Sequence, residues 1–213
     1  MKLTFRGRYK TEDQLPRTNL PHNAVKFREP ETMDRIDFVS SFFLIPAILL
    51  VGLFVLASYL LHGVLLNGPS RMIERSLIGL IILAIMPIVP IIPQELLRVI
   101  ILGRDTIVEL FYAPKLLMVF FASTTPIKKW HFVCMSFLPS LVIGWLPLLV
   151  WVVLPPNEWY RNYLFWFSFF SIIHGRRDYM NVYNALRQMP EGSIRQGCGL
   201  HSYWYTPEKE ASA

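Results

Sequence analysis

Residues 93–98 read Pro-Gln-Glu-Leu-Leu-Arg, and they lie at the C-terminal end of a long apolar run. With histidine at positions 94 and 98 the motif would read His-Glu-Leu-Leu-His, which places two imidazoles on one helix face beside a general base. The stretch therefore predicts a helix that carries polar groups within an apolar part of the chain. Whether an enzyme is expected depends on the interpretation of Gln94 and Arg98.

The composition is that of a small membrane protein. Of the 213 residues, 53% are hydrophobic and 17% are charged, and the formal net charge is +6. The basic residues flank apolar segments, where they act as topology signals and contact anionic lipid, so nucleic acid is not an expected partner. Cys134 lies in an apolar run and Cys198 in a polar tail, which predicts two free thiols and no disulfide.

The hydropathy pattern predicts a mainly α-helical, multi-pass protein of the cell membrane with about four transmembrane helices, because about 20 apolar residues cross the hydrocarbon core. The spans are expected near residues 38–66, 76–102, 132–154 and 160–178. Residues 1–37 form a polar N-terminal segment without a signal-peptide pattern, 38–178 the membrane domain, and 179–213 a C-terminal tail. The distribution of Lys and Arg places both termini and this tail in the cytoplasm.

Three prolines interrupt the second apolar segment. Pro87, Pro90 and Pro93 each remove a backbone donor and bend or break a helix. We expect a break near 87–93 and a new helix that starts near Pro93 and carries Gln94, Glu95 and Arg98.

Residues 106–123 predict a β-hairpin, because two β-prone runs surround Ala113-Pro114-Lys115. The alternative is a continuation of the preceding helix. An exposed strand of such a hairpin can bind an extended segment through its backbone. Leu116, Met118 and Phe120 are therefore the candidate peptide-binding residues.

Further motifs follow residues 93–98 in a definite order: Thr125-Pro126-Ile127-Lys128-Lys129-Trp130, a span with Leu138-Pro139 and Trp145-Leu146-Pro147, and His174-Gly175-Arg176-Arg177-Asp178. The ordered set resembles the DUF3267 family of bacterial zincin peptidases, which are similar to site-2-type intramembrane metalloproteases. The resemblance implies a zinc site formed by two histidines and a glutamate of one helix and an aspartate of a later span. Glu95 matches the general base and Asp178 the third ligand, whereas Gln94 and Arg98 occupy the two histidine positions.

These two replacements oppose zinc binding. A glutamine amide is a poor zinc ligand, and arginine has no lone pair to offer and stays cationic. We therefore expect no bound cofactor, with zinc as the alternative that the resemblance implies. A buried ion pair between Arg98 and Asp178 would take the place of the metal, because an intramembrane charge is costly unless it is paired.

Two other interpretations of the polar residues remain. Gln94, Glu95 and Arg98 can mark the end of a span, with Arg98 extending to the lipid headgroups. A different metal site is also conceivable from four residues, two of which share a helix face at i and i+4: His62, Glu95, His174 and Asp178.

The sequence thus predicts a non-catalytic membrane protein on a peptidase scaffold that binds a peptide, a membrane protein or an assembly in the lipid bilayer. The first alternative is an active membrane metalloprotease with atypical ligands, in which Glu95 activates a metal-bound water. The second alternative is a transport or immunity component.

Overall fold

A computed structural model describes residues 2–9, 11–63, 77–103, 106–113, 118–156 and 160–207. The chain divides into two compact units, each assembled from separate stretches of sequence. The sheet unit comprises Met1–Val39, Arg98–Ser136 and Met180–Ala213, and the helix unit comprises Ser40–Leu97 and Phe137–Tyr179. The predicted division at residues 37 and 178 rests on membrane placement and stays a prediction.

The sheet unit contains two small β-sheets, whereas the sequence predicts only the single hairpin at residues 106–123. The first has the strand order β1-β3-β4, with β1 parallel to β3 and β4 antiparallel to it. The second has the order β2-β7-β6-β5, and its described pairs are antiparallel. The strands are β1 (Lys2–Arg8), β2 (Val25–Lys26), β3 (Ile107–Ala113), β4 (Met118–Ala122), β5 (Ile127–Lys128), β6 (Ile194–Cys198) and β7 (His201–Tyr205), with a short 3-10 helix η1 (Glu12–Gln14) after β1.

The predicted hairpin is confirmed, and the alternative of a continued helix is wrong. Helix α5 (Ile91–Leu102) ends before Gly103, whose φ of 97° is left-handed and suits glycine. Strands β3 and β4 then pair from Glu109 with Ala122 to Ala113 with Met118. The predicted C-terminal tail also contains secondary structure, because β6 and β7 form a second hairpin within residues 179–213.

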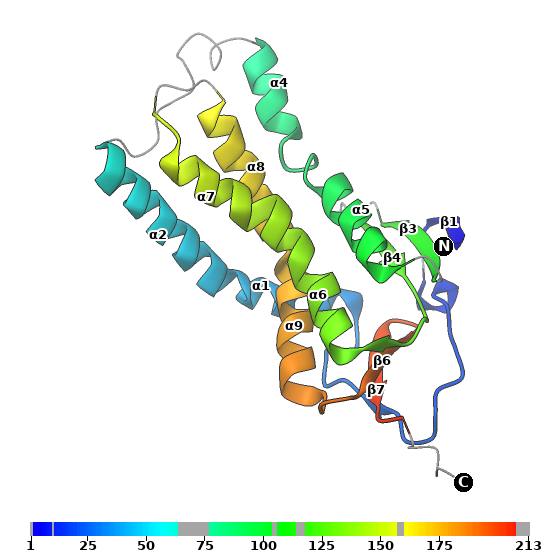
Figure 1. Cartoon of the computed structure of the whole chain (residues 1–213). Helices are drawn as coiled ribbons and strands as arrows, with labels where there is room; N and C mark the ends of the chain where they lie inside the picture. The colour runs from blue at the N-terminus through cyan, green and yellow to red at the C-terminus, as the bar shows by residue number, and fades with distance from the viewer. Residues whose placement is uncertain are drawn as a thin grey trace. The chain divides into compact units, whose positions relative to one another are not determined.

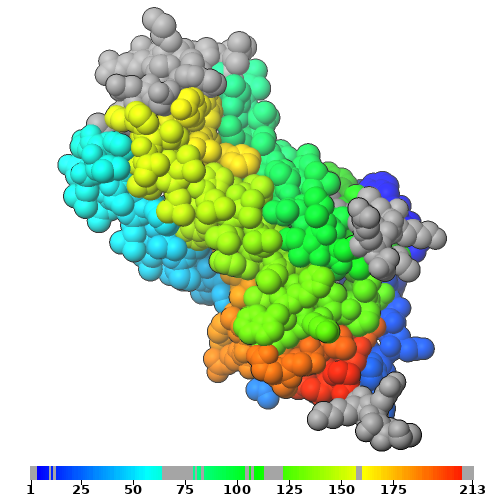
Figure 2. Space-filling view, in the orientation of Figure 1, coloured from blue at the N-terminus to red at the C-terminus, as the bar shows by residue number. Residues whose placement is uncertain are grey.

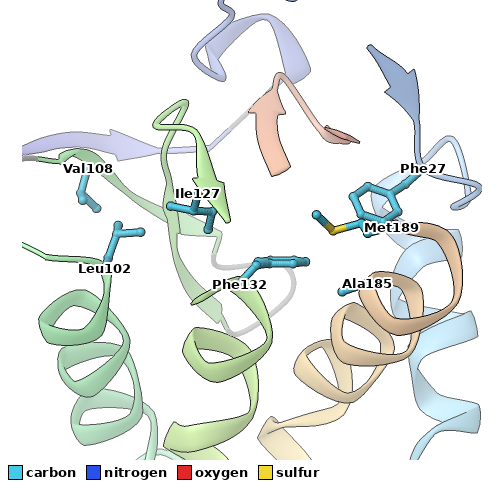
Figure 3. Packing of buried hydrophobic residues seen from close by; sticks show 7 residues of the cluster. All are labelled: Phe27, Leu102, Val108, Ile127, Phe132, Ala185 and Met189. Atoms are coloured by element: carbon cyan, nitrogen blue, oxygen red, sulfur yellow. The ribbon is translucent and has the colours of Figure 1, made fainter. Parts of the chain in front are cut away.

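The core of the sheet unit is assembled from strands and helix ends that lie far apart in the sequence (Figure 3). Leu102 at the end of α5 and Val108 of β3 point toward one another, while Phe27 lies beside Met189. Phe132 belongs to α6 (Lys129–Ser140) and lies between these two groups. Burial of these side chains fixes both sheets against the helix ends of the same unit.

The helix unit is a bundle in which α2 contacts α7 and α8 (Figure 1). Its core contains Leu148 and Trp151, both fully buried, and the ring of Phe165 lies 4.9 Å from that of Trp151. The helices of the unit are α2 (Leu44–His62), α4 (Leu77–Ile85), the π-helix η3 (Leu141–Trp145), α7 (Leu146–Val153) and α8 (Arg161–His174). The helices α1 (Met33–Phe42), α5, α6 and α9 (Arg176–Gln188) each have one end in either unit.

Four transmembrane spans are not supported. Among the described residues, two helical stretches are long and apolar enough to cross a membrane by length and composition, Met33–His62 and Lys129–Val153. They correspond to the first and third predicted spans. The first helical stretch ends at His62 because Gly63 takes a left-handed conformation with φ of 70° and caps α2. Residues 64–66 of the first predicted span and residue 76 of the second lie outside the described residues.

The second and fourth predicted spans fail for different reasons. In the second, residues 86–90 form a turn between α4 and α5, which have 9 and 12 residues and are too short to cross alone. This break is the one that the three prolines predict. In the fourth, α8 ends after 14 residues at His174, and the polar α9 follows Gly175.

Helix α2 (cyan in Figure 2) exposes many large apolar side chains. Leu49, Leu53 and Leu60 expose 60 to 76% of their surface. A surface of this composition is unfavourable in water and is solvated well by lipid chains.

Candidate functional site

Gln94 connects α5 to α8 in the interior of the helix unit. Its side chain is buried, and its amide Nε2 donates to the backbone carbonyl of Ser171 at 2.8 Å and to Ser171 Oγ at 2.5 Å. The bond to the carbonyl fixes the orientation of the amide, since a carbonyl oxygen only accepts. Both amide hydrogens are therefore used within the protein.

A second contact joins the same two segments. His174, the last residue of α8, donates from its ring Nε2 to the carbonyl of Pro87, in the turn between α4 and α5. Because that carbonyl accepts only, the hydrogen of the neutral ring lies on Nε2. His174 thus holds the proline-rich turn against the end of α8, and Gln94 holds the following helix α5 against the same helix.

Small residues let η3 approach α8 closely at this point. A Cβ added to Gly144 would lie 3.0 Å from a side-chain carbon of Ile172 and 3.2 Å from Ser171 Oγ. A Cβ added to Gly175 would meet Ser140 Oγ and lie 3.0 Å from the Tyr179 ring. Ser171 is therefore enclosed by the amide of Gln94 on one helix and by the backbone of Gly144 on another.

The π-helical turn of η3 has a physical cause in the sequence. Pro147 has no N–H group, so the carbonyl of Ile143 lacks its usual partner four residues ahead. The chain widens over Leu141–Trp145 and resumes an α-helix at Leu146. This local widening lies between Pro139 and Pro147 and includes Gly144, the residue that faces Ser171.

The structure brings several of the predicted site residues into the helix unit. Glu95 follows Gln94 on α5, is partly buried, and lies within electrostatic range of the His174 ring. Asp178 is buried in the first turn of α9, where a carboxylate is favoured by the helix dipole. Arg98 lies one turn after Gln94 on α5 but belongs to the sheet unit, so its pairing with Asp178 stays a prediction.

The three predicted peptide-binding residues are only partly placed. Leu116 lies outside the described residues. The backbones of Met118 and Phe120 belong to β4, which is an edge strand in the order β1-β3-β4. The edge position agrees with a strand that accepts an extended segment, while the roles of these side chains stay predictions.

In the described part of the chain, the residues at the predicted site do not form the donor set of a zinc site. Among the described residues, no group of three or more His, Cys, Asp and Glu side chains is placed to hold a metal ion. The alternative set from His62, Glu95, His174 and Asp178 is therefore not assembled. His62 Nε2 instead lies 2.9 Å from the Val152 carbonyl, and Gln94 uses its amide nitrogen on Ser171.

Sequence reasoning did not identify Ser140, Gly144, Ser171 and Gly175 as part of this region. A signal was present, because Ser140 and Gly144 are four residues apart in one apolar helix, as are Ser171 and Gly175 across the end of another. Small residues at this spacing allow the close approach of helices in membranes. Which helices these small residues bring together depends on the tertiary structure, so the pattern alone did not reveal the contact.

Comparison with known proteins gives one match. The profile of the DUF3267 family, described as "Putative zincin peptidase", matches residues 88–194, which is half of the chain. The matched part contains Gln94, Glu95, the hairpin and Asp178. No curated protein and no solved structure matches the chain.

Proposed function

Because this chain belongs to the DUF3267 family, we propose that it is a membrane protein on a zincin-peptidase scaffold that holds no zinc and cuts no peptide. In this proposal it binds an extended peptide segment along β4. The two parts of the proposal rest on different observations and are tested separately.

The observation that carries the non-catalytic role is the side chain of Gln94. At this position the family motif has a ligand histidine, and here the amide nitrogen donates to Ser171 at 2.8 and 2.5 Å. Its amide nitrogen has no lone pair to offer a metal ion, and its amide oxygen is a poor zinc ligand beside imidazole, thiolate and carboxylate. The hydrogen bonds hold α5 to α8, which is a connection that a shared metal provides in a metalloprotease.

Arg98 supports the same proposal through its charge. It replaces the second histidine, one helical turn from Gln94, with a guanidinium that stays protonated and has no free lone pair. A divalent cation beside it would be repelled.

The binding role follows from the position of β4 at the edge of its sheet. Its backbone pairs with β3 on one side, and a strand in this position offers backbone donors and acceptors to an added strand on its other side. The partner segment would form backbone hydrogen bonds with β4, and this binding needs no catalytic centre. The proposed membrane placement is supported by Met33–His62 and Lys129–Val153, which are long and apolar enough to cross a bilayer by length and composition.

A pair of short peptides tests the binding role. One peptide alternates threonine and valine, and the control peptide has the same sequence with an N-methyl group on every residue, so it lacks backbone donors on both edges. We expect the first peptide, but not the control, to slow amide hydrogen exchange at alternate residues of Met118–Ala122 in detergent micelles. Equal protection by both peptides, or by neither, would contradict strand addition.

The same preparation tests the absence of cleavage. Glu95→Gln removes the carboxylate that a metalloprotease would use as general base. We expect the wild type and this variant to bind the peptide equally and to leave it intact over a long incubation. Cleavage by the wild type that is lost in Glu95→Gln would support the active metalloprotease instead.

A further inference from the structure

Arg161, the first residue of α8, is a buried cation whose hydrogen-bonding groups are only partly satisfied. Its side chain is 1% exposed, and Nη2 donates to Ser58 Oγ at 2.5 Å. Nε and Nη1 are buried and make no hydrogen bond. No salt bridge joins Arg161 to an acid in the described part of the chain. A buried charge of this kind is costly unless an anion or several acceptors compensate for it.

A second unsatisfied donor lies against the guanidinium. The Cζ of Arg161 lies 4.6 Å from the centre of the Trp151 ring, and Trp151 is fully buried with its indole Nε1 also lacking a hydrogen-bond partner. Arginine and tryptophan side chains donate hydrogen bonds and cannot accept them. The cluster of Arg161 and Trp151 therefore lacks acceptors, and it cannot satisfy itself by rearrangement of these two side chains.

The N-terminus of α8 lies at the same place and also favours a hydrogen-bond acceptor. Helix α8 has 14 residues, and its N-cap residue Tyr160 makes no side-chain capping hydrogen bond. The dipole at a helix N-terminus favours an anion. The dipole of this helix start and the unsatisfied buried guanidinium both favour an anionic ligand.

The location of the cluster indicates which anion it would take. Ser58 lies near the C-terminal end of α2 and Trp151 in the last turn of α7, so the ends of these helices and the start of α8 meet at one end of the bundle (Figure 1). If α2 and Lys129–Val153 cross a bilayer as proposed above, this end lies at the depth of the lipid headgroups. Phosphate groups are concentrated there, and a phosphate has several acceptor oxygens for donors that point in different directions.

We propose that Arg161, Trp151 and the N-terminus of α8 form a binding site for a phosphate group, carried by a lipid headgroup or present as free phosphate. The bound oxyanion accepts from the guanidinium and the indole and neutralises the buried charge. Its chemistry is independent of peptide binding at β4. Only the lipid source depends on the proposed membrane placement.

The test compares ligands added to the full chain in a phosphate-free maltoside detergent. The thermal unfolding midpoint is measured with phosphatidylglycerol, with inorganic phosphate, and with a neutral glycosyl diacylglycerol of the same acyl chains. We expect the midpoint to rise with phosphatidylglycerol and not with the glycolipid, because a ligand that binds only the folded state stabilises it. An equal rise with inorganic phosphate would identify free phosphate as the source.

Substitutions separate a binding role from a structural one. Arg161→Met should weaken the response to phosphate by about tenfold or more, because hydrogen bonds to a charged group are lost. The matched control is Arg187→Met, since Arg187 also stacks on an aromatic ring, that of Tyr183, but at an exposed site. This control should respond as the wild type does.

A further variant guards against misfolding of Arg161→Met. Trp151→Phe keeps a ring below the guanidinium and removes only the indole N–H, so it should fold and respond more weakly than the wild type. The proposal is overturned if the wild type responds to neither phosphate ligand. It is also overturned if the wild type and both site variants respond equally.

Discussion

Gln94 stabilises the helix unit through two buried hydrogen bonds that connect α5 to α8. We expect Gln94→Leu, which keeps most of the volume and removes both bonds, to lower the free energy of unfolding by about 1–3 kcal/mol. The measurement is unfolding of the full chain in mixed micelles. Equal stability of Gln94→Leu and the wild type would contradict the contact.

Glu29 in the sheet unit gives a prediction on pH. Burial raises the pKa of its carboxyl above the ordinary 4.5, although the Ser202 N–H, His201 and Arg195 each act in the opposite direction. The folded state therefore keeps the proton after the unfolded state has lost it. The stability of the wild type relative to Glu29→Gln should fall as pH rises from 4.5 through the folded pKa.

The measurement for Glu29 is the unfolding midpoint of both proteins across this pH range. Glu29→Gln keeps an oxygen that accepts from the Ser202 N–H, a bond of 2.8 Å in the wild type, so the comparison isolates the charge. Glu31→Gln, at a side chain that is 80% exposed, serves as the control. A relative stability that rises with pH would show that the charged form of Glu29 is favoured by folding.

At the level of elements, the packing of the junction between α8 and α9 against the end of α6 depends on Gly175 and Ser140. We expect Gly175→Ala to destabilise the helix unit by about 1–3 kcal/mol, because its Cβ would meet Ser140 Oγ and the Tyr179 ring. Ser140→Ala added to Gly175→Ala should recover part of the loss. Unfolding of the single and double variants forms a cycle that measures the coupling between the two positions.

Gly52 provides the matched control for this cycle. It lies in the middle of α2, and an added Cβ would have no neighbour within 4 Å. Gly52→Ala should therefore be neutral or stabilise the helix by up to about 1 kcal/mol. If Gly175→Ala behaves like Gly52→Ala, the close approach at Gly175 is wrong.

The elements that the sequence predicted correctly have strong local causes. Pro87, Pro90 and Pro93 break the second apolar segment, and the β-prone runs around Pro114 form β3 and β4. The pairing of β1 with β3 joins residues about a hundred positions apart, and no local pattern specifies it. The second sheet was missed for the same reason, since β2 pairs with β7 across most of the chain.

At the level of the whole molecule, hydropathy predicted the apolar segments but overestimated the number of spans. It counts apolar residues along the sequence and does not register that a turn at residues 86–90 leaves two short helices. Within the candidate site, the motif identified Gln94 and Glu95. Their neighbours Ser171 and His174 depend on the tertiary packing of α8, so sequence spacing did not reveal the contact with Ser171.

The proposed scaffold is maintained without zinc, and the zinc content of the purified chain decides between it and a metalloprotease. The protein is expressed in zinc-supplemented medium, purified without chelator and analysed by elemental mass spectrometry, beside the double variant Gln94→His with Arg98→His. We predict that the wild type contains zinc well below one ion per chain and that a chelator leaves its unfolding midpoint unchanged. One zinc per wild-type chain, removed by chelator with a loss of stability, would contradict the account.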